Sequence, residues 1–334
     1  MERVSDLGEF GLIGRLTRFF KNDDPSIIRD FGDDAAFVRL GDRLLVLTVD
    51  ALVEGVHFLG FYPPVSVGRK LAAVNASDAA AKAARPLYAL VNLGLPPETP
   101  LPYAEGLYEG LAEGARRYGF SVVGGNTTAA PALCLDLSLI AEAKRPVFRE
   151  VPRPGLSIFV SGTLGDSRAG LELLLEFYER EKPSSFFPSP EDLFEAAGFG
   201  DRERFLVKRH LEPVARTDLI PVVGEKAVAS MDVSDGLLSD LKKLSPRFAV
   251  RLEVSELPLS RELVEFCSER GRDPRLYALL GGEDYELLVA SGEDLSPFGF
   301  TKIGEVLNEE GPKVVDERGR PLEGEGFDHL IRPR

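Results

Sequence analysis

RLLVLTVD at residues 43–50 and VSVGRKLAAVNASDAAAKAA at residues 65–84 decide the fold of this chain. The first stretch is a run of leucine and β-branched residues that ends on an acid, which is typical of a buried strand. The second is rich in alanine, contains no proline and is closed by Arg85-Pro86, so it predicts a helix. A buried strand that leads into a helix indicates the α/β class.

The alternation of strand and helix continues through the first half of the chain. The pattern predicts a strand at 88–95, a helix at 102–118, a short strand at 121–123 and a strand at 133–143. The short strand runs into Gly124-Gly125, which we interpret as a turn. We assign the chain to the α/β class, with an α+β N-terminal half.

Proline and glycine interrupt the pattern at residues 149–155 (REVPRPG), which predicts a boundary between two domains, 1–148 and 149–334. Residues 182–200, rich in proline, serine and phenylalanine, are expected to form a surface excursion. The other elements expected in the second domain are strands at 157–161, 250–254 and 285–290, a leucine-rich helix after a glycine turn at 162–167, and a strand-turn-helix unit at 227–244.

Composition excludes several classes of function. The net charge is −14 over 334 residues, whereas nucleic-acid binding needs lysine and arginine to neutralise phosphates. The N-terminus lacks a signal-peptide pattern and no apolar run approaches the ~20 residues that span a bilayer, so we expect a cytoplasmic protein without membrane contact. Cys134 and Cys267 stand far apart in unlike contexts, which argues against a disulfide or a cysteine metal site.

Short acidic clusters are scattered along the chain, and basic residues are sparse beside them. Carboxylates that converge in space repel one another, and a hard cation with oxygen ligands reconciles them. The sequence therefore predicts several magnesium ions. The clusters contain Asp33-Asp34, Asp50, Asp78, Asp232, Asp235 and Glu283-Asp284, and Asn126 belongs to a related polar stretch.

Each cluster also has a structural explanation. Gly-Asp-Asp is a common turn, and Asp235 suits the start of a helix. Asp78 is harder to explain this way, because aspartate is a poor residue for a helix interior. Asp50 and Asp232 end strands, and ligands of α/β proteins bind at the carboxyl ends of strands. We keep the structural interpretation for Asp34, Asp166 and Asp284.

The phosphate-binding motifs of common nucleotide enzymes are missing. No GxxxxGK[ST] loop occurs, and kinase HRD and DFG motifs are absent. ATP binding would therefore depend on acids and magnesium. Residues 124–128 (GGNTT) suit either a hairpin turn or a loop whose backbone N–H groups approach a phosphate. His57 follows Asp50 by seven positions and can reach the same crevice.

Read together and in order, these motifs closely resemble the thiamine-monophosphate kinase family, part of the superfamily that includes aminoimidazole ribonucleotide synthetase and selenophosphate synthetase. The match spans nearly the whole chain. The residues that carry it are EFGLI at 9–13, GDDAA at 32–36, TVDALVEGVHF at 48–58, NASD at 75–78, GGNTT at 124–128, SGTLGDS at 161–167, MDVSDGL at 231–237 and GGEDYEL at 281–287.

The resemblance implies an N-terminal domain whose mixed sheet pairs with its copy in a homodimer, and a C-terminal α/β domain that covers the ligand cleft. It implies direct, magnesium-assisted in-line transfer of the γ-phosphoryl group of ATP to thiamine phosphate. The roles it implies fall on three sets of residues. Magnesium would be held by Asp33, Thr48, Val49, Asp50, Asp78, Asn126, Asp232 and Asp235, with Asp50 and Asp78 as the catalytic pair. ATP would contact Tyr108, Gly125, Asn126, Arg149 and Ser234. Thiamine phosphate would contact His57, Glu283 and Phe327.

Two positions depart from the pattern of the family. Asn126 stands where the family commonly has aspartate, and Lys82 stands where it often has an uncharged residue. Two other functions stay open. The first is another ATP-dependent synthetase of the superfamily, similar to aminoimidazole ribonucleotide synthetase. The second is a magnesium-nucleotide-binding protein without catalysis.

Overall fold

The structure is a computed structural model that describes residues 3–324. Its first sheet is mixed, with strand order β1-β2-β3-β6-β4-β5. Neighbouring strands run antiparallel except β4 and β5, which are parallel. The bounds are Ile27–Arg29 for β1, Ala36–Leu40 for β2, Arg43–Val53 for β3, Ala84–Leu95 for β4, Ser121–Ala129 for β5 and Cys134–Ala143 for β6.

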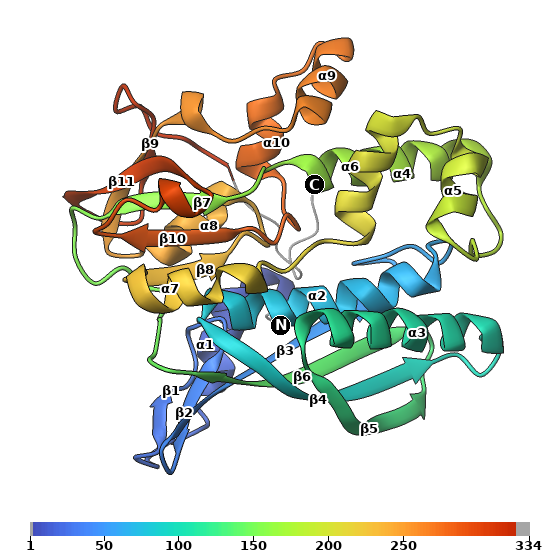
Figure 1. Cartoon of the computed structure of the whole chain (residues 1–334), viewed down its shortest axis with the longest axis horizontal. Helices are drawn as coiled ribbons and strands as arrows, with labels where there is room; N and C mark the ends of the chain where they lie inside the picture. Colours follow the sequence, from blue (N-terminus) through green and yellow to red (C-terminus); the bar gives the residue numbers. More distant parts are fainter. Residues whose placement is uncertain (1–2, 325–334) are drawn as a thin grey trace.

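Helices α2 (Pro64–Ala81) and α3 (Leu101–Tyr118) cover one face of this sheet (Figure 1). The two helices pack closely, because a Cβ on Gly110 would lie 1.9 Å from the carbonyl oxygen of Val65. Along β3, side chains alternate between the two faces, so Thr48 and Asp50 point toward α2 while Val49 points to the other face. We call that second surface the open face.

The second sheet has strand order β12-β9-β11-β7-β10-β8. Its neighbours are antiparallel except β12 and β9, which are parallel. The strand bounds are Ser157–Ser161 for β7, Ala229–Asp232 for β8, Phe248–Leu252 for β9, Leu287–Ser291 for β10, Phe300–Glu310 for β11 and Val314–Val315 for β12.

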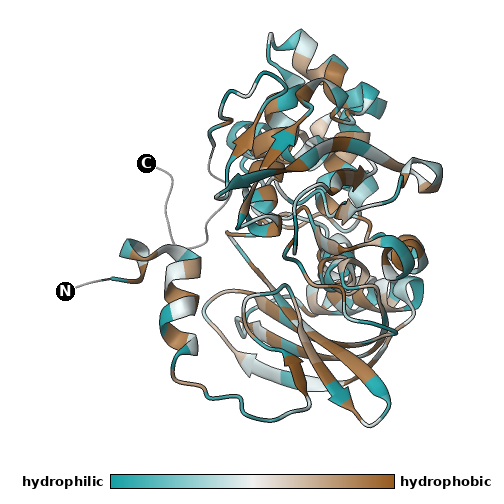
Figure 2. Ribbon diagram, turned by 90° about the vertical axis from the view of Figure 1, so that its left-hand side faces the viewer, coloured by the Kyte–Doolittle hydropathy of each residue, from teal (hydrophilic) through white to brown (hydrophobic). Residues whose placement is uncertain are grey.

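The remaining α-helices belong mainly to the second half of the chain, where α4, α6 and α9 pack on one another beside the second sheet (Figure 1). Their bounds are Gly8–Thr17 for α1, Asp166–Glu181 for α4, Pro190–Ala197 for α5, Asp201–Leu211 for α6, Ile220–Lys226 for α7, Leu237–Leu244 for α8, Arg261–Glu269 for α9 and Pro274–Leu280 for α10. Short 3₁₀ turns occupy Val4–Asp6, Thr217–Leu219, Val254–Glu256 and Ser296–Phe298. Figure 2 shows α1 standing at the edge of the molecule, beside the first sheet.

Helix α2 lies between the two halves of the molecule (Figure 1). It packs against β3, β4 and β6 on one side and against β8, β10 and α7 on the other. A helix surrounded in this way is buried on all sides, which explains its alanine-rich sequence without a clear apolar stripe. The polar residues on α2 are therefore carried into the contact between the two sheets.

Two expectations about local structure were wrong. Residues 124–128 form no turn or loop but continue β5, paired in parallel with β4. Gly125 suits this strand because a Cβ there would lie 1.8 Å from the carbonyl oxygen of Val91. The segment 182–200 is no simple excursion, since it contains α5, whose Leu193 and Phe194 are buried in the core.

Most of the other expected elements are confirmed within one to four residues, and β7 has the bounds that the sequence predicts. Both cysteines are free thiols. Within residues 3–324 no helix combines the length and the apolar character that crossing a bilayer requires. The domain boundary at 148/149 stays a prediction.

Candidate active site

A pocket of about 320 Å³ opens between the two halves of the molecule. The residues predicted from the sequence that line it come from β3, α2, β8, the loops that follow β3 and β8, and the loop between α10 and β10: Asp50, His57, Asp78, Asp232, Ser234, Asp235 and Glu283. The sequence clusters thus converge, although they are up to 233 positions apart in the chain.

Asp78 and Asp232 form the acidic centre of the pocket. Asp78 is half-buried on α2 and accepts a hydrogen bond from the hydroxyl of Thr48 on β3. Asp232 ends β8, is 4% exposed, and accepts from the hydroxyl of Ser77. Among the described residues neither carboxylate has an ion-pair partner, so we call these two the hydroxyl-bonded pair.

Burial and mutual repulsion make both carboxyl groups reluctant to ionise. Desolvation, and then the charge of Asp50, raises the pKa of Asp78 well above its usual value. Desolvation, and then the charge of Asp34, raises the pKa of Asp232 to about 7. Both shifts are those expected where buried acids crowd together without a cation. The centre therefore favours any ligand that brings positive charge.

Asp50 is positioned by the same helix. Its backbone N–H donates to the side-chain oxygen of Asn75 at 3.1 Å, and the amide of Asn75 donates to the carbonyl of Leu71 at 3.0 Å. Asn75 and Asp78 share one face of α2, as the sequence predicts, and together they hold the end of β3.

Asp33 and Asp34 lie just outside the pocket lining and contradict the expectation of sparse basic neighbours. The Nζ atom of Lys82 lies 2.7 Å from Asp33 and 2.8 Å from Asp34. Arg149 donates its backbone N–H to Asp33 at 3.0 Å and its guanidinium to Asp34 at 2.9 Å. We call Asp33 and Asp34 the ion-paired carboxylates. Their charges explain why a lysine is buried at position 82, which the sequence alone did not explain.

Asp235 also has a cation beside it. Lys243 of α8 donates to Asp235 and, at 2.7 Å, to the buried Asp240. Asp240 in turn accepts from the backbone N–H groups of Ser234 and Asp235, at 3.0 and 3.1 Å. This arrangement fixes the loop between β8 and α8, so that Ser234 and Asp235 face the pocket.

The far end of the pocket contains Glu283 and His57. Glu283 lies 2.6 Å from the Nζ atom of Lys70 and 3.3 Å from Nδ1 of His210, both of which are buried. Its φ angle of +61° is rare for a non-glycine residue and is typical of strained functional loops. His57 accepts the backbone N–H of Val53 on Nδ1 at 3.0 Å, which leaves the ring proton on Nε2.

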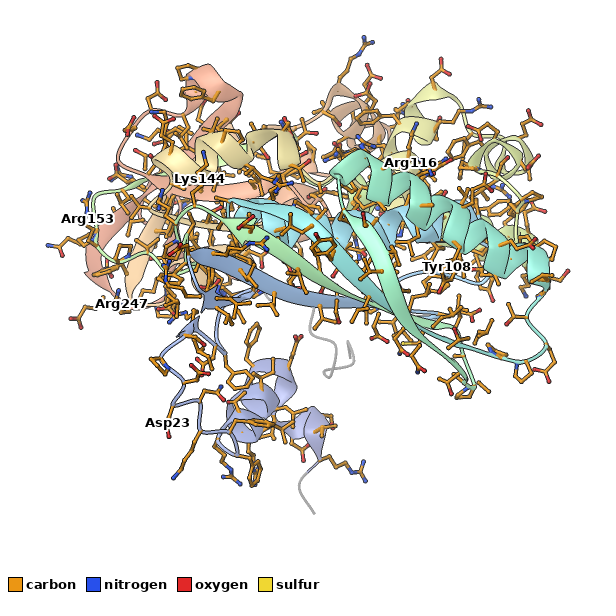
Figure 3. The ribbon with its side chains drawn as sticks, turned by 60° about the horizontal axis from the view of Figure 1, so that its bottom comes forward. Asp23, Tyr108, Arg116, Lys144, Arg153 and Arg247 are labelled. Carbon is orange, nitrogen blue, oxygen red and sulfur yellow. The ribbon has the colours of Figure 1, made fainter. Side chains whose placement is uncertain are left out.

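Several predicted residues are absent from the pocket lining. Val49 is 60% exposed on the open face, and Asn126 lies on that face as well, where it donates to Asn92 at 3.1 Å. Gly125 is its neighbour on β5. Tyr108 is 41% exposed on α3 (Figure 3). Phe327 lies outside the described residues.

The structure adds site residues that the sequence analysis did not single out. Lys70 and Ser77 project from α2 and hold Glu283 and Asp232, respectively. His210 contacts the hydroxyls of Tyr62 and Ser167, each at 3.2 Å, and burial lowers its pKa to about 3, so it is neutral. Arg168 brings a positive charge to the lining of the pocket. Ser77 directly precedes Asp78 in the NASD motif, which could have drawn attention to it, whereas nothing local marks His210.

Within residues 3–324, no three Asp, Glu, His or Cys side chains are already gathered as a metal site. Magnesium does not require such a cage, since it commonly keeps waters and takes one or two carboxylates plus substrate phosphates. Asp50, Asp78 and Asp232 have the oxygen chemistry and the excess negative charge that suit such an ion. Asp33 does not suit it equally well, because its oxygens already face Lys82 and Arg149.

The chain is similar to proteins of known function over nearly its whole length. Residues 32–143 match the family model of the AIR synthase related protein, N-terminal domain. Thiamine-monophosphate kinase of Aquifex aeolicus is 41% identical, with 98% of this chain and 100% of the relative covered. The enzyme of that name from Mycobacterium tuberculosis is 34% identical, with 94% and 89% covered.

A solved structure supports the same assignment. AaThiL complexed with AMPPCP and TMP superposes with a TM-score of 0.85 at 38% sequence identity, covering 98% of this chain and 99% of the solved one. The two sheets and the helix between them thus form the fold of that solved structure. The chain belongs to the thiamine-monophosphate kinase family.

Proposed function

We propose that this protein is a thiamine-phosphate kinase, which transfers the γ-phosphoryl group of ATP to the phosphate of thiamine phosphate. The observation that carries the proposal is the pocket in which Asp50, Asp78 and Asp232 face Glu283 and His57. The end with Asp50, Asp78 and Asp232 suits metal-bound phosphates, and the end with Glu283 and His57 suits an organic substrate. The relatives named thiamine-monophosphate kinase support the same reaction.

Magnesium is the cofactor that suits this site. Asp50, Asp78 and Asp232 would hold it, with Asp235 and the hydroxyl of Thr48 close by. When bound, magnesium supplies charge neutralisation for the phosphates of donor and acceptor. The raised pKa values of Asp78 and Asp232 fit this role, because burial and then the charge of neighbouring carboxylates disfavour their ionised forms, and a bound cation would favour them.

The residues of the chain would act by positioning. An oxygen of the acceptor phosphate attacks the γ-phosphorus while the bond to the β,γ-bridging oxygen breaks, giving ADP and thiamine diphosphate. The acceptor oxygen is already ionised near neutral pH, so no general base is needed. Glu283, fixed by Lys70 and His210, and His57 would hold the thiamine end, so that the acceptor phosphate points to the acids.

The remaining predicted ligands would need a second copy of the chain. Strands β6 and β4 lie between β3 and β5, so Asp50 and Asn126 are about 14 Å apart across the sheet. The register also places Asp50 and Asn126 on opposite faces. One chain cannot bring both to one ion. A homodimer would bring the Asn126 of a second copy, with its neighbour Gly125 on β5, toward the site.

The open face has the character of such an interface. Apolar side chains on it are exposed, notably Leu47 at 37%, Val49 at 60%, Tyr88 at 49% and Leu90 at 49%. A contiguous apolar surface of this kind is typical of a contact between protein chains. We propose that two open faces pack together. A monomeric mass in sedimentation equilibrium at micromolar concentration would refute this.

The deciding experiment is an assay of ADP and thiamine diphosphate with ATP, in the presence and absence of thiamine phosphate and of magnesium. We expect both products in equal amounts only when all components are present. ADP release without thiamine diphosphate would favour another synthetase of the superfamily. Nucleotide binding without turnover would favour a non-catalytic protein. The expected cytoplasmic location stays a prediction.

A further inference from the structure

Lys82 follows the last turn of α2 and is 0% exposed. Its Nζ atom lies 2.7 Å from Oδ1 of Asp33, 2.8 Å from Oδ2 of Asp34 and 2.7 Å from the carbonyl oxygen of Ser230. An ammonium group has three donors, and three oxygen atoms lie within 2.8 Å of this one. The ammonium of Lys82 is thus held by Asp33 and Asp34 from the first half of the molecule and by Ser230 from the second.

The carboxylate of Asp33 is satisfied as well. Oδ1 lies 2.7 Å from the ammonium of Lys82 and accepts the backbone N–H of Asp34 at 3.0 Å. Oδ2 accepts the backbone N–H of Arg149 at 3.0 Å and lies 3.5 Å from the guanidinium of Arg29. A magnesium ion at Asp33 would have to displace these groups or stand beside the ammonium, where two cations repel.

The surroundings of Asp33 and Asp34 differ in charge balance from the rest of the site. Asp33 and Asp34 carry two negative charges, and Lys82 and Arg149 carry two positive charges; a third cation, Arg29, is shared between Asp33 and Glu150. Within residues 3–324, Asp78 and Asp232 have hydroxyl partners and no ion-pair partner.

We propose that Lys82 is a built-in cation that takes the place of one magnesium ion at Asp33 and Asp34. Asp33 then binds the ammonium and holds no metal. Magnesium is bound only around Asp50, Asp78 and Asp232. The inference rests on the proposed function for the presence of magnesium, but it concerns a different set of ligands and is tested without measuring catalysis.

The test is the number of magnesium ions bound per chain, measured by equilibrium dialysis against MgCl2 with a non-hydrolysable ATP analogue. Asp33→Asn keeps an oxygen for Lys82 and should leave this number unchanged, whereas Asp78→Asn should lower it. Loss of an ion in Asp33→Asn would overturn the inference. Absence of bound magnesium in the parent protein would instead refute the proposed metal requirement.

The complementary variant removes the cation. Lys82→Met leaves two carboxylates facing each other, so its melting temperature without magnesium should fall by roughly 5–10 °C. Magnesium should restore at least half of this loss and add one bound ion per chain. Lys70→Met is the matched control, because Lys70 is also a buried lysine of α2 but lies beside Glu283; it should gain no ion. If magnesium stabilises both variants equally, the inference is wrong.

Discussion

Two pairs of carboxylates at helix α2 differ in the groups that bind them. The ion-paired carboxylates, Asp33 and Asp34, contact Lys82 and Arg149. The hydroxyl-bonded pair, Asp78 and Asp232, accepts hydrogen bonds from Thr48 and Ser77 and has no ion-pair partner within residues 3–324. The first pair is neutralised by the chain itself, and the second still requires positive charge from outside.

The difference separates residues that maintain the fold from residues that bind ligands. Charges buried beside their own counter-ions are expensive to disturb, because removing one leaves the other uncompensated. Charges buried without counter-ions destabilise the protein until a ligand arrives, which is typical of functional sites. Substitutions in the two pairs should therefore affect different measurements.

The largest effect should come from Asp78→Asn. The amide keeps the shape of the carboxylate and an acceptor for Thr48, but it removes the charge that would hold magnesium. Transfer to thiamine phosphate at saturating ATP should fall by about 10²- to 10³-fold. Thermal stability without magnesium should stay the same or rise, because repulsion from Asp50 and Asp232 is relieved.

Asp42→Asn, in the exposed turn between β2 and β3, is the control for this variant and should keep full activity. Parental turnover by Asp78→Asn would show that the hydroxyl-bonded pair does not hold the metal.

Asp34→Asn should lower the stability of the protein, which Asp78→Asn should leave unchanged or raise. It leaves Lys82 and Arg149 with one charged partner fewer, at distances of 2.8 and 2.9 Å in the parent. Breaking a buried ion pair in this way costs about 3–5 kcal/mol. We expect the free energy of unfolding in urea to fall by such an amount.

The matched control is Asp218→Asn, whose ion pair with Arg216 is 62% exposed on the aspartate side. That substitution should cost below about 1 kcal/mol. Equal losses in the two variants would remove the distinction between the pairs.

Asp232→Asn tests the other pair through pH. The pKa of Asp232 is about 7 in the folded chain, against about 3.9 in an unfolded one. A raised pKa means that the parent is most stable below about pH 4 and loses stability as pH rises to about 7. Without magnesium, the variant should escape this loss and exceed the parent at pH 8 by at most about 4 kcal/mol.

The measurement is the melting temperature of both proteins between pH 4 and pH 8. Near pH 4 the two should converge. Curves that stay parallel over the whole range would mean that Asp232 does not titrate between these values.

Local patterns in the sequence predicted much of the fold and of the acidic centre. The leucine and β-branched run at 43–50 fixed β3, and the mid-helical position of Asp78 already pointed to function. Residues 124–128 were misassigned because glycine is poor in strands, yet here a neighbouring backbone approaches too closely for a side chain. That approach depends on the register of β4 and β5, which no local pattern contains.

The pairing of Lys82 with Asp33 and Asp34 also could not be predicted from the sequence. The helix places Lys82 one turn after Asp78, but the acids precede it by 49 and 48 positions and reach it only through the packing of the first sheet on α2. His210 is a similar case, since α6 meets Ser167 and Glu283 only in the tertiary structure. The sequence therefore marked the acids but not which of them have partners.

The smallest effect should come from His57→Ala, at the end of the pocket away from both pairs. Its Nδ1 accepts the backbone N–H of Val53, which orients the ring in the pocket lining, where it would contact the substrate. Loss of one hydrogen bond to the substrate costs about 0.5–1.5 kcal/mol. The KM for thiamine phosphate should therefore rise by up to about tenfold, while the KM for ATP and the number of bound magnesium ions stay unchanged. A similar rise in both KM values would place His57 with the acids and would mean that the pocket does not have separate metal and substrate ends.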